Sequence, residues 1–314
     1  MQVNDLILKE LLKRGYSLQG RTRVWDISDS KLWYLTPEQA QAYLDLVETQ
    51  KYKEGIGPKE LSLLKENMDS IIKELGKKPV NIIDLGCGNG KKAALLIENM
   101  KGRIKFRYCP IDISGYMVEN AIENIKKLDA AEIVEFQWNI SDFENLENIT
   151  PLLRKSEYKR NLFLLLGNTL GNFEIHELLH EIRSGMRDGD LLLIGNGLDN
   201  HKVEEDIVKS CKENKGFDIF LSYIPLQLGL ARDTIEYNVR FSNSRIEFYY
   251  TLLSNKTLKF QEKEVHFYKG DQIIVALAYQ YEKEEFMSYL HMYFKNVKIY
   301  ESSDGSYSLV LCTK

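Results

Sequence analysis

The sequence predicts an α/β protein whose parallel sheet is covered by helices on both faces. Three observations predict this fold class. Short apolar segments alternate with helical segments between residues 76 and 198. The strand segments are apolar along their whole length, which is typical of parallel strands buried on both faces. Closely spaced glycines follow the first of these strands and open a helix, as a tight strand–helix turn requires.

The first 75 residues are predicted to be mostly helical and to form an N-terminal cap. Leucines at helical spacing indicate a helix over residues 3–14. Thr36 is expected to cap a second helix, with a proline in its first turn and Gln39 three residues after the cap. A third helix is expected over residues 59–75. Its apolar face is expected to consist of Leu61, Leu64, Met68, Ile71, Ile72 and Leu75.

Residues 76–198 are predicted to form the central domain. Strands are expected over residues 80–85, 106–113, 133–137, 161–166 and 190–195. Helices are expected between them over residues 91–100, 116–128 and 174–186. Regular alternation of strands and helices predicts a parallel sheet of β–α–β units.

The remaining residues are predicted to form two further segments. Alternating apolar and polar residues indicate antiparallel strands in an inserted α+β domain over residues 199–281, with a turn at Gly270 and Asp271. Residues 282–314 are expected to form a last helix and a strand pair that complete the sheet.

Composition excludes several classes of protein. The 314 residues include 42 lysines and arginines and 46 aspartates and glutamates, a net charge of −4, whereas general nucleic-acid binders usually have a basic surplus. No apolar run is long enough for a membrane span, and the N-terminus lacks the features of a signal peptide. The four cysteines form no closely spaced pair, which argues against a disulfide framework and a four-cysteine zinc site. We therefore expect a soluble, cytoplasmic protein.

The glycine loop has the sequence Asp84-Leu-Gly86-Cys87-Gly88-Asn-Gly90. Its third glycine comes one residue earlier than in the dinucleotide fingerprint, and an acidic residue stands two positions before the first glycine. In this form the segment resembles the glycine loop of class I S-adenosylmethionine-dependent methyltransferases, which have a Rossmann-like sheet. A short loop and a helix start can receive the cofactor's carboxylate, and a carboxylate side chain can balance its cationic end. A turn that binds no ligand is the alternative.

Two acidic residues follow the next two strands. Asp112, with Ile113 beside it, comes 26 residues after Gly86, where an acidic residue in this type of fold binds the ribose hydroxyls. Asp142 and Phe143 follow the third strand, where such methyltransferases bind and stack the adenine. Taken alone, Asp142 could equally be a turn or helix-cap residue. The three signals at successive strand ends together predict an S-adenosylmethionine site.

Several other segments resemble one family, the L-histidine Nα-methyltransferases of ergothioneine biosynthesis. The segment L-F-L-L-L-G-N-T-L-G-N-F over residues 162–173 is similar to the family's F-L-G-S-T-I-G-N. The segment Y-C-P-I-D-I-S over residues 108–114 matches Y-x-P-V-D-V-S, and residues 25–33 have the spacing of Y-D-x-x-G-S-x-L-F. The resemblance covers nearly the whole chain, strongly over residues 80–195 and weakly over residues 199–280.

The resemblance implies roles for individual residues. Asp84, Gly86, Cys87, Gly88, Asp112, Ile113, Asp142 and Phe143 would hold the cofactor. Lys92 stands at the family's lysine and would bind the cofactor's carboxylate, unless it is a solvated lysine of a first helical turn. Asn172 stands at the asparagine that binds the amino-acid end of the acceptor, unless it is a left-handed turn residue after Gly171. Tyr52 is matched with the tyrosine that precedes the cofactor site only if the alignment is given a gap.

The departures from the family concern the acceptor. Trp25 stands where the family has a tyrosine that contacts the acceptor. Ala276 and Ala278 stand where the family has a glutamate and a serine that hold the imidazole. A site without these polar contacts is not expected to select histidine. We therefore expect N-methylation of another small acceptor, an amine or amino acid, with no nucleic-acid or membrane partner.

Other interpretations rest on separate features. His176-Glu177-Leu-Leu-His180 matches the letters of a zinc protease motif, but helical periodicity turns both histidines outward and no third ligand is near, so no metal is expected. A nucleic-acid methyltransferase is disfavoured because no N-P-P-Y-type motif follows the fourth strand. A non-catalytic cofactor-binding module and transfer of an aminopropyl group stay open. No side chain is predicted to act as a general base.

Overall fold

The computed structural model describes residues 3–49, 56–199, 204–260 and 262–314. The chain forms two compact units, each built from two separate segments. One unit contains residues 1–49 and 201–279, and the other contains residues 50–200 and 280–314. The boundary that the sequence suggested at residue 75 differs from this division, because helix α4 (Ile56–Leu75) shares a core with the sheet of the second unit.

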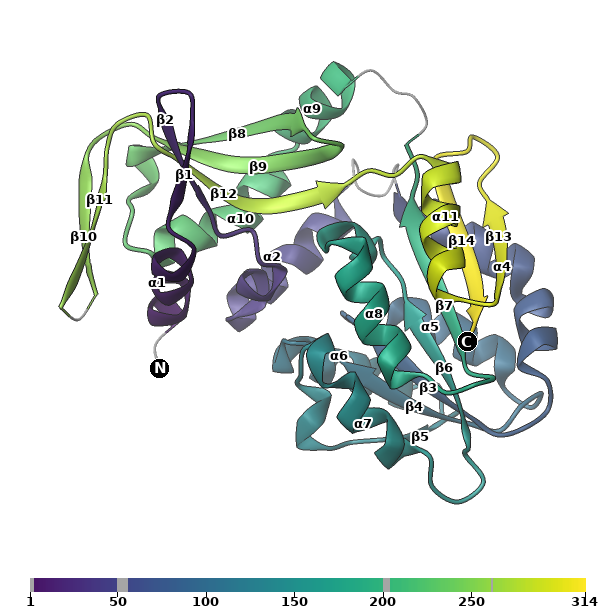
Figure 1. The fold of residues 1–314 in the computed structure, drawn as a ribbon. Helices are drawn as coiled ribbons and strands as arrows, with labels where there is room; N and C mark the ends of the chain where they lie inside the picture. Colours follow the sequence, from purple (N-terminus) through teal and green to yellow (C-terminus); the bar gives the residue numbers. More distant parts are fainter. Residues whose placement is uncertain (1–2, 50–55, 200–203, 261) are drawn as a thin grey trace. The chain divides into compact units, whose positions relative to one another are not determined.

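The second unit contains a seven-stranded sheet with the order β13-β14-β7-β6-β3-β4-β5 (Figure 1). Neighbouring strands from β7 to β5 are parallel, whereas β14 is antiparallel to both β7 and β13. The strands are β3 (Val80–Leu85), β4 (Phe106–Ile111), β5 (Glu132–Ile133), β6 (Arg160–Leu165), β7 (Leu191–Gly197), β13 (Asn296–Glu301) and β14 (Tyr307–Thr313). The five parallel strands have the 3-2-1-4-5 order of doubly wound folds, which confirms the predicted α/β fold class.

Helices pack on both faces of this sheet. They are α4, α5 (Lys91–Met100), α6 (Gly115–Lys126), α7 (Leu146–Leu153), α8 (Ile175–Gly185) and α11 (Lys283–Tyr293), with 3-10 turns over Gln137–Asn139, Phe143–Asn145 and Thr169–Asn172. Apolar side chains of α4 and α5 form one core with alternate residues of the strands, and α8 lies on the opposite face (Figure 1).

Two local predictions in this unit were wrong. The strand expected over residues 133–137 ends at Ile133. The chain turns there because the buried Asn139 side chain donates to the carbonyls of Pro110 and Val134, at 2.6 and 3.1 Å. In α4, Leu61 is 36% exposed, and Glu60 is buried in its place.

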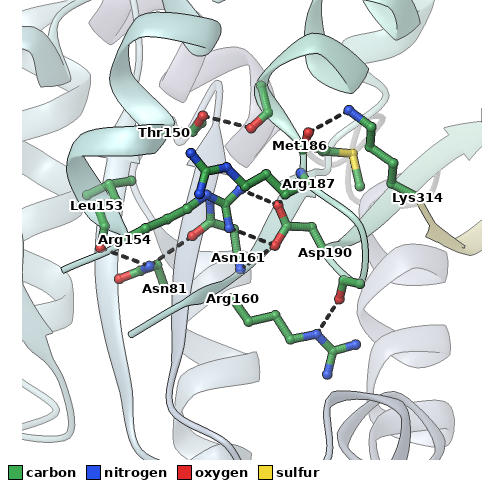
Figure 2. Close-up of polar contacts among 12 residues, drawn as sticks. Asn81, Thr150, Leu153, Arg154, Arg160, Asn161, Met186, Arg187, Asp190 and Lys314 are labelled. Carbon is green, nitrogen blue, oxygen red and sulfur yellow. Dashed lines mark hydrogen bonds and ion pairs between the residues drawn. The ribbon is translucent and has the colours of Figure 1, made fainter. Parts of the chain in front are cut away.

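A buried polar network lies where the parallel strands begin (Figure 2). Arg154 forms an ion pair with Asp190, and the two side chains are 5% and 2% exposed. Asp190 also accepts hydrogen bonds from the backbone amides of Asn161 and Arg187, at 2.9 and 2.8 Å. The network therefore joins the starts of β6 and β7 to the end of α7.

The first unit contains a five-stranded sheet with the order β1-β2-β12-β9-β8 and a separate two-stranded ribbon, β10-β11. Its strands are β1 (Tyr16–Gln19), β2 (Thr22–Asp26), β8 (Ile235–Ser242), β9 (Arg245–Leu252), β10 (Lys256–Phe260), β11 (Lys263–Phe267) and β12 (Gln272–Tyr279). Its helices are α1 (Val3–Arg14), α2 (Pro37–Glu48), α9 (Glu204–Glu213) and α10 (Lys215–Gln227), with 3-10 turns over Ser30–Tyr34 and Arg232–Thr234.

The N-terminal part of this unit is less helical than predicted. Residues 16–26 form a hairpin, and its second strand, β2, pairs in parallel with β12. The predicted start of α2 is confirmed, because Thr36 Oγ1 accepts from the Gln39 amide at 3.3 Å and Gln39 Oε1 accepts from the Thr36 amide at 3.1 Å. The predicted turn at Asp271 is confirmed as well, since its amide donates to the Tyr268 carbonyl at 3.0 Å.

Candidate functional site

The glycine loop turns tightly between β3 and α5. Gly86, Gly88 and Gly90 have φ angles of 64°, 51° and 72°, which residues with a side chain rarely adopt. The Gly86 amide donates to the Ile111 carbonyl at 2.8 Å, which holds the loop against the end of β4. Among the described residues, no atom lies within 4 Å of the position that a Cβ on Gly88 would occupy. The loop therefore leaves open space beside the half-buried backbone of Gly88.

Asp84 lies under this loop, near the end of β3. Its side chain is buried and accepts a hydrogen bond from the Tyr108 hydroxyl at 2.7 Å. Burial raises the pKa of Asp84 to about 7, although the Tyr108 hydrogen bond and the charge of Lys92 act in the opposite direction. Its carboxyl group therefore changes protonation state near neutral pH.

Asp112 joins the glycine loop to the end of β4. Its Oδ2 atom accepts from the Gly88 amide at 3.2 Å, and its Oδ1 atom accepts from the Ser114 amide at 3.0 Å. Burial raises the pKa of Asp112 to about 6, and these backbone hydrogen bonds oppose that shift. Ile113 is half-buried beside it. The structure thus brings Asp112, at the end of β4, into contact with the glycine loop that follows β3.

Asp142 and Phe143 lie at the next strand end. A parallel bridge joins Asp112 to Ile140, two residues before Asp142. Asp142 caps the 3-10 turn that begins at Phe143, because its Oδ1 atom accepts from the Glu144 amide at 3.0 Å. The Phe143 ring lies 3.8 Å from the Cβ position of Gly86 and 5.6 Å, between centroids, from the Phe173 ring. An aromatic surface therefore adjoins the glycine loop.

Lys92, in the first turn of α5, forms an ion pair with a residue that the sequence analysis missed. Its Nζ atom lies 2.6 Å from Oε2 of Glu60, whose side chain is fully buried. Glu60 was overlooked because no motif contains it. A signal was nevertheless present, since Glu60 precedes Leu64 and Met68 at intervals of four residues and so falls on the apolar face of its helix.

Asn172 ends the 3-10 turn that follows β6, and it is half-buried. The residues of this segment with positive φ are Gly167 and Asn168, at 81° and 61°, and not Asn172. Asn168 Oδ1 accepts from the Gly197 amide at 2.7 Å, which ties the segment to the end of β7. The explanation of Asn172 as a left-handed residue is therefore wrong.

Of the residues expected near the acceptor, Asn172 belongs to the second unit, whereas Trp25, Ala276 and Ala278 belong to the first. Trp25 is a buried residue of β2, with its ring 5.0 Å from that of Tyr16 and 5.1 Å from that of Phe267. Its Nε1 atom has no hydrogen-bond partner among the described residues. Ala276 and Ala278 lie on β12, opposite Phe248 and Ile246 of β9. Tyr52, which was matched with a residue of the cofactor site, lies outside the described residues.

The two histidines of the zinc-protease pattern lie on α8. His176 packs edge-on against Tyr289, and its Nδ1 atom is 3.1 Å from the Tyr293 hydroxyl. His180 is exposed. Within the described residues, no group of three or more histidine, cysteine, aspartate or glutamate side chains is placed to hold a metal ion.

Comparison with known proteins identifies the family. A family model described as histidine-specific, S-adenosylmethionine-dependent methyltransferase matches residues 41–314. The chain belongs to this family. The predicted enzyme class and its cofactor, S-adenosylmethionine, are therefore confirmed. The open space beside Gly88, the buried acidic residues and the adjoining aromatic ring fit this cofactor, because they leave room for a ligand and supply carboxylate acceptors and a stacking surface.

Individual relatives are more distant. The N-methyltransferase fsqC of Aspergillus fumigatus is 25% identical over 148 residues, which are 46% of this chain and 40% of that protein. Ergothioneine biosynthesis protein 1 of Schizosaccharomyces pombe is 26% identical over 128 residues, 40% of this chain and 17% of that protein. The matches thus span less than half of each relative.

Solved structures also show similarity. An S-adenosylmethionine-dependent methyltransferase from Clostridium acetobutylicum is 11% identical, with a TM-score of 0.47 over 87% of this chain and 98% of that one.

In the parts of the chain that the structure describes, no helix is long and apolar enough to cross a membrane.

The raised pKa values predict a pH dependence of cofactor binding. Asp112 and Asp84 are protonated below about pH 6 and about pH 7, respectively. A protonated carboxyl group no longer balances a cationic ligand and is a weaker acceptor for ribose hydroxyls. We expect the dissociation constant for S-adenosylmethionine to fall as the pH rises from about 5.5 to 7.5, by up to about tenfold per pH unit for each proton released. Isothermal titration calorimetry across this range tests the prediction, and a pH-independent constant would contradict it.

Proposed function

We propose that this chain transfers a methyl group from S-adenosylmethionine to a nitrogen of a small, amino-acid-like acceptor, and that free histidine is not its preferred acceptor. Family membership and the geometry around Asp112 support the first part. The second part rests on two residues of β12. In the histidine methyltransferases that the sequence resembles, the residues at the positions of Ala276 and Ala278 hold the imidazole.

These positions offer only methyl groups. Ala276 is 3% exposed, and Phe248 and Ile246, which lie opposite the two alanines on β9, are buried as well. A polar site that binds an NH group of its substrate rejects ligands without that group, but an apolar site has no such contact to offer. Trp25, a buried indole that packs against Tyr16 and Phe267, stands where the family has a tyrosine. An acceptor with an apolar or aromatic side chain fits these residues better than imidazole does.

Positioning is the main task of the protein in this reaction. When bound, S-adenosylmethionine supplies a methyl group that its sulfonium has already activated. Asp112 is proposed to hold the ribose, and Asp142 with Phe143 the adenine. Lys92 is proposed to bind the carboxylate, and Asn172 the amino-acid end of the acceptor. A neutral amine needs orientation and exclusion of water more than a dedicated base, and we assign none.

Release of S-adenosylhomocysteine tests the acceptor. The protein is incubated with S-adenosylmethionine and either free histidine or a pool of other amino acids and small amines. We expect release with the pool, at least about tenfold above the rate with histidine. Fractionating the pool then identifies the acceptor. Preferential release with histidine would contradict the proposed acceptor, and cofactor binding without any release would favour a non-catalytic module or a macromolecular acceptor.

A double substitution, Ala276→Glu with Ala278→Ser, provides the matched control. It restores the two polar residues of the resembling family, so turnover of histidine is expected to rise while turnover of the pool acceptor falls. Circular dichroism shows whether the variant folds, because Ala276 is buried. A folded variant with unchanged preference would show that these positions do not select the acceptor.

A further inference from the structure

Glu60 is a buried carboxylate that no motif of the sequence contains. It lies in the first turns of α4, and its side chain is completely inaccessible to solvent. Burying a charged group is unfavourable unless the charge is paired and its remaining lone pairs are satisfied. Its partners therefore indicate what the residue does.

Four elements of the same unit meet at this carboxylate. Oε1 accepts from the backbone amide of Gly167, just after β6, and from the hydroxyl of Tyr307 on β14, both at 2.8 Å. Oε2 lies 2.6 Å from Nζ of Lys92 on α5. Glu60 thus joins its own helix to the lysine beside the glycine loop and to the segment that leads to Asn172.

Two glycines make room for this arrangement. A Cβ on Gly195 of β7 would collide with Glu60 Oε1, and a Cβ on Gly167 would collide with Lys92 Nζ. The backbone of Gly167 also has a φ angle of 81°, which favours glycine. Glu60 Oε1 and Lys92 Nζ therefore lie directly beside backbone atoms at the carboxyl ends of the strands. This is the edge of a parallel α/β sheet at which ligands bind.

We propose that Glu60 is a positioning residue of the cofactor site. It holds the Lys92 ammonium and the Gly167 backbone in the arrangement that receives the amino-acid carboxylate of S-adenosylmethionine. A lysine ammonium has three donors, so an ion pair with Glu60 is compatible with binding a second carboxylate from a ligand. The inference rests on the proposed function, because it requires Lys92 to contact the cofactor.

Two ligands that differ in one part distinguish this role from a purely structural one. S-adenosylhomocysteine contains the amino-acid carboxylate, whereas 5′-methylthioadenosine has the same nucleoside without it. Calorimetric titration of both ligands into wild-type protein and into Glu60→Gln is the experiment. We expect the variant to bind S-adenosylhomocysteine about tenfold to 100-fold more weakly, as for a lost charge-assisted contact, and methylthioadenosine within about twofold of wild type.

Further variants test the link to Lys92. Lys92→Met is expected to show the same selective loss of S-adenosylhomocysteine binding. The double variant Glu60→Gln/Lys92→Met is expected to bind this ligand no more than about twofold more weakly than Lys92→Met alone, because both substitutions remove the same interaction. Tyr307→Phe is the matched control. It removes one hydrogen bond to Oε1 and leaves Oε2 with Lys92, so both ligands are expected to bind within about threefold of wild type. Should Glu60→Gln fail to fold, Glu60→Asp keeps the charge but shortens the reach to Lys92, and the same selective loss is expected.

Three outcomes would overturn the inference. Equal weakening of both ligands would make Glu60 a residue of the fold alone. Fully additive losses would separate Glu60 from Lys92. Absence of S-adenosylhomocysteine binding to wild-type protein would overturn the proposed function itself, and the inference with it, which distinguishes that failure from the other two.

Discussion

Replacing Asp112 with asparagine is expected to weaken S-adenosylmethionine binding by about 100-fold. The two carboxylate oxygens of Asp112 accept from the amides of Gly88 and Ser114. An asparagine supplies only one acceptor, so its NH2 group faces one of these amide donors. The charged acceptor proposed for the ribose hydroxyls is lost as well. Equilibrium binding by calorimetry measures the effect, and turnover is expected to fall in parallel at low cofactor concentration.

Asp188→Asn is the matched control for this change. Asp188 is an aspartate of the same unit with a side chain that is 84% exposed, so its substitution is expected to leave binding within about twofold of wild type. Thermal unfolding shows whether each variant keeps its fold. A folded Asp112→Asn protein that binds the cofactor normally would show that Asp112 does not hold the ribose.

Replacing Arg154 with methionine is expected to lower the free energy of unfolding by about 3–5 kcal/mol. The change leaves Asp190 as a buried carboxylate without its ionic partner, although the amides of Asn161 and Arg187 still donate to it. For a chain of this size, a loss of this order lowers the melting temperature by about 10 °C. Differential scanning calorimetry or thermal circular dichroism measures the change.

Two further variants separate the buried charge from a general effect of mutation. The double variant Arg154→Met/Asp190→Asn removes the uncompensated charge, so this protein is expected to be more stable than Arg154→Met alone. Lys105→Met breaks an ion pair with Glu157 in which the side chains are 62% and 50% exposed, so its cost is expected to stay below about 1 kcal/mol. Equal losses of unfolding free energy in Arg154→Met and Lys105→Met would show that burial of the ion pair does not determine the cost of breaking it. Because the network lies where the strands begin, folded Arg154→Met is expected to bind cofactor normally.

Local signals made much of the second unit predictable. Apolar strands, alternating helices and the loop around Gly86 each depend on residues close in sequence. Asp112 and Asp142 could be placed relative to that loop because the carboxyl ends of parallel strands meet at one edge of the sheet. The same argument could not find Glu60, whose partners Gly167 and Tyr307 lie 107 and 247 residues away.

Long-range pairing also explains the wrong predictions elsewhere. Strand β2 has only five residues, and its partner β12 comes from the other end of the unit's sequence. Residues 22–26, with the sequence T-R-V-W-D, have no alternating pattern of their own, so the leucine spacing of the flanking segments favoured helix. The early end of β5 depends on the side-chain amide of Asn139, a tertiary contact that strand propensity does not report.

The interleaving of the two units has a consequence for synthesis in the cell. Strand β2 pairs with β12, and β7 pairs with β14, so one edge of each early strand stays open while the chain emerges from the ribosome. At ordinary elongation rates, the interval between β2 and β12 lasts roughly 10–50 s. Open strand edges promote aggregation. The yield of folded protein is therefore expected to depend on chaperone supply.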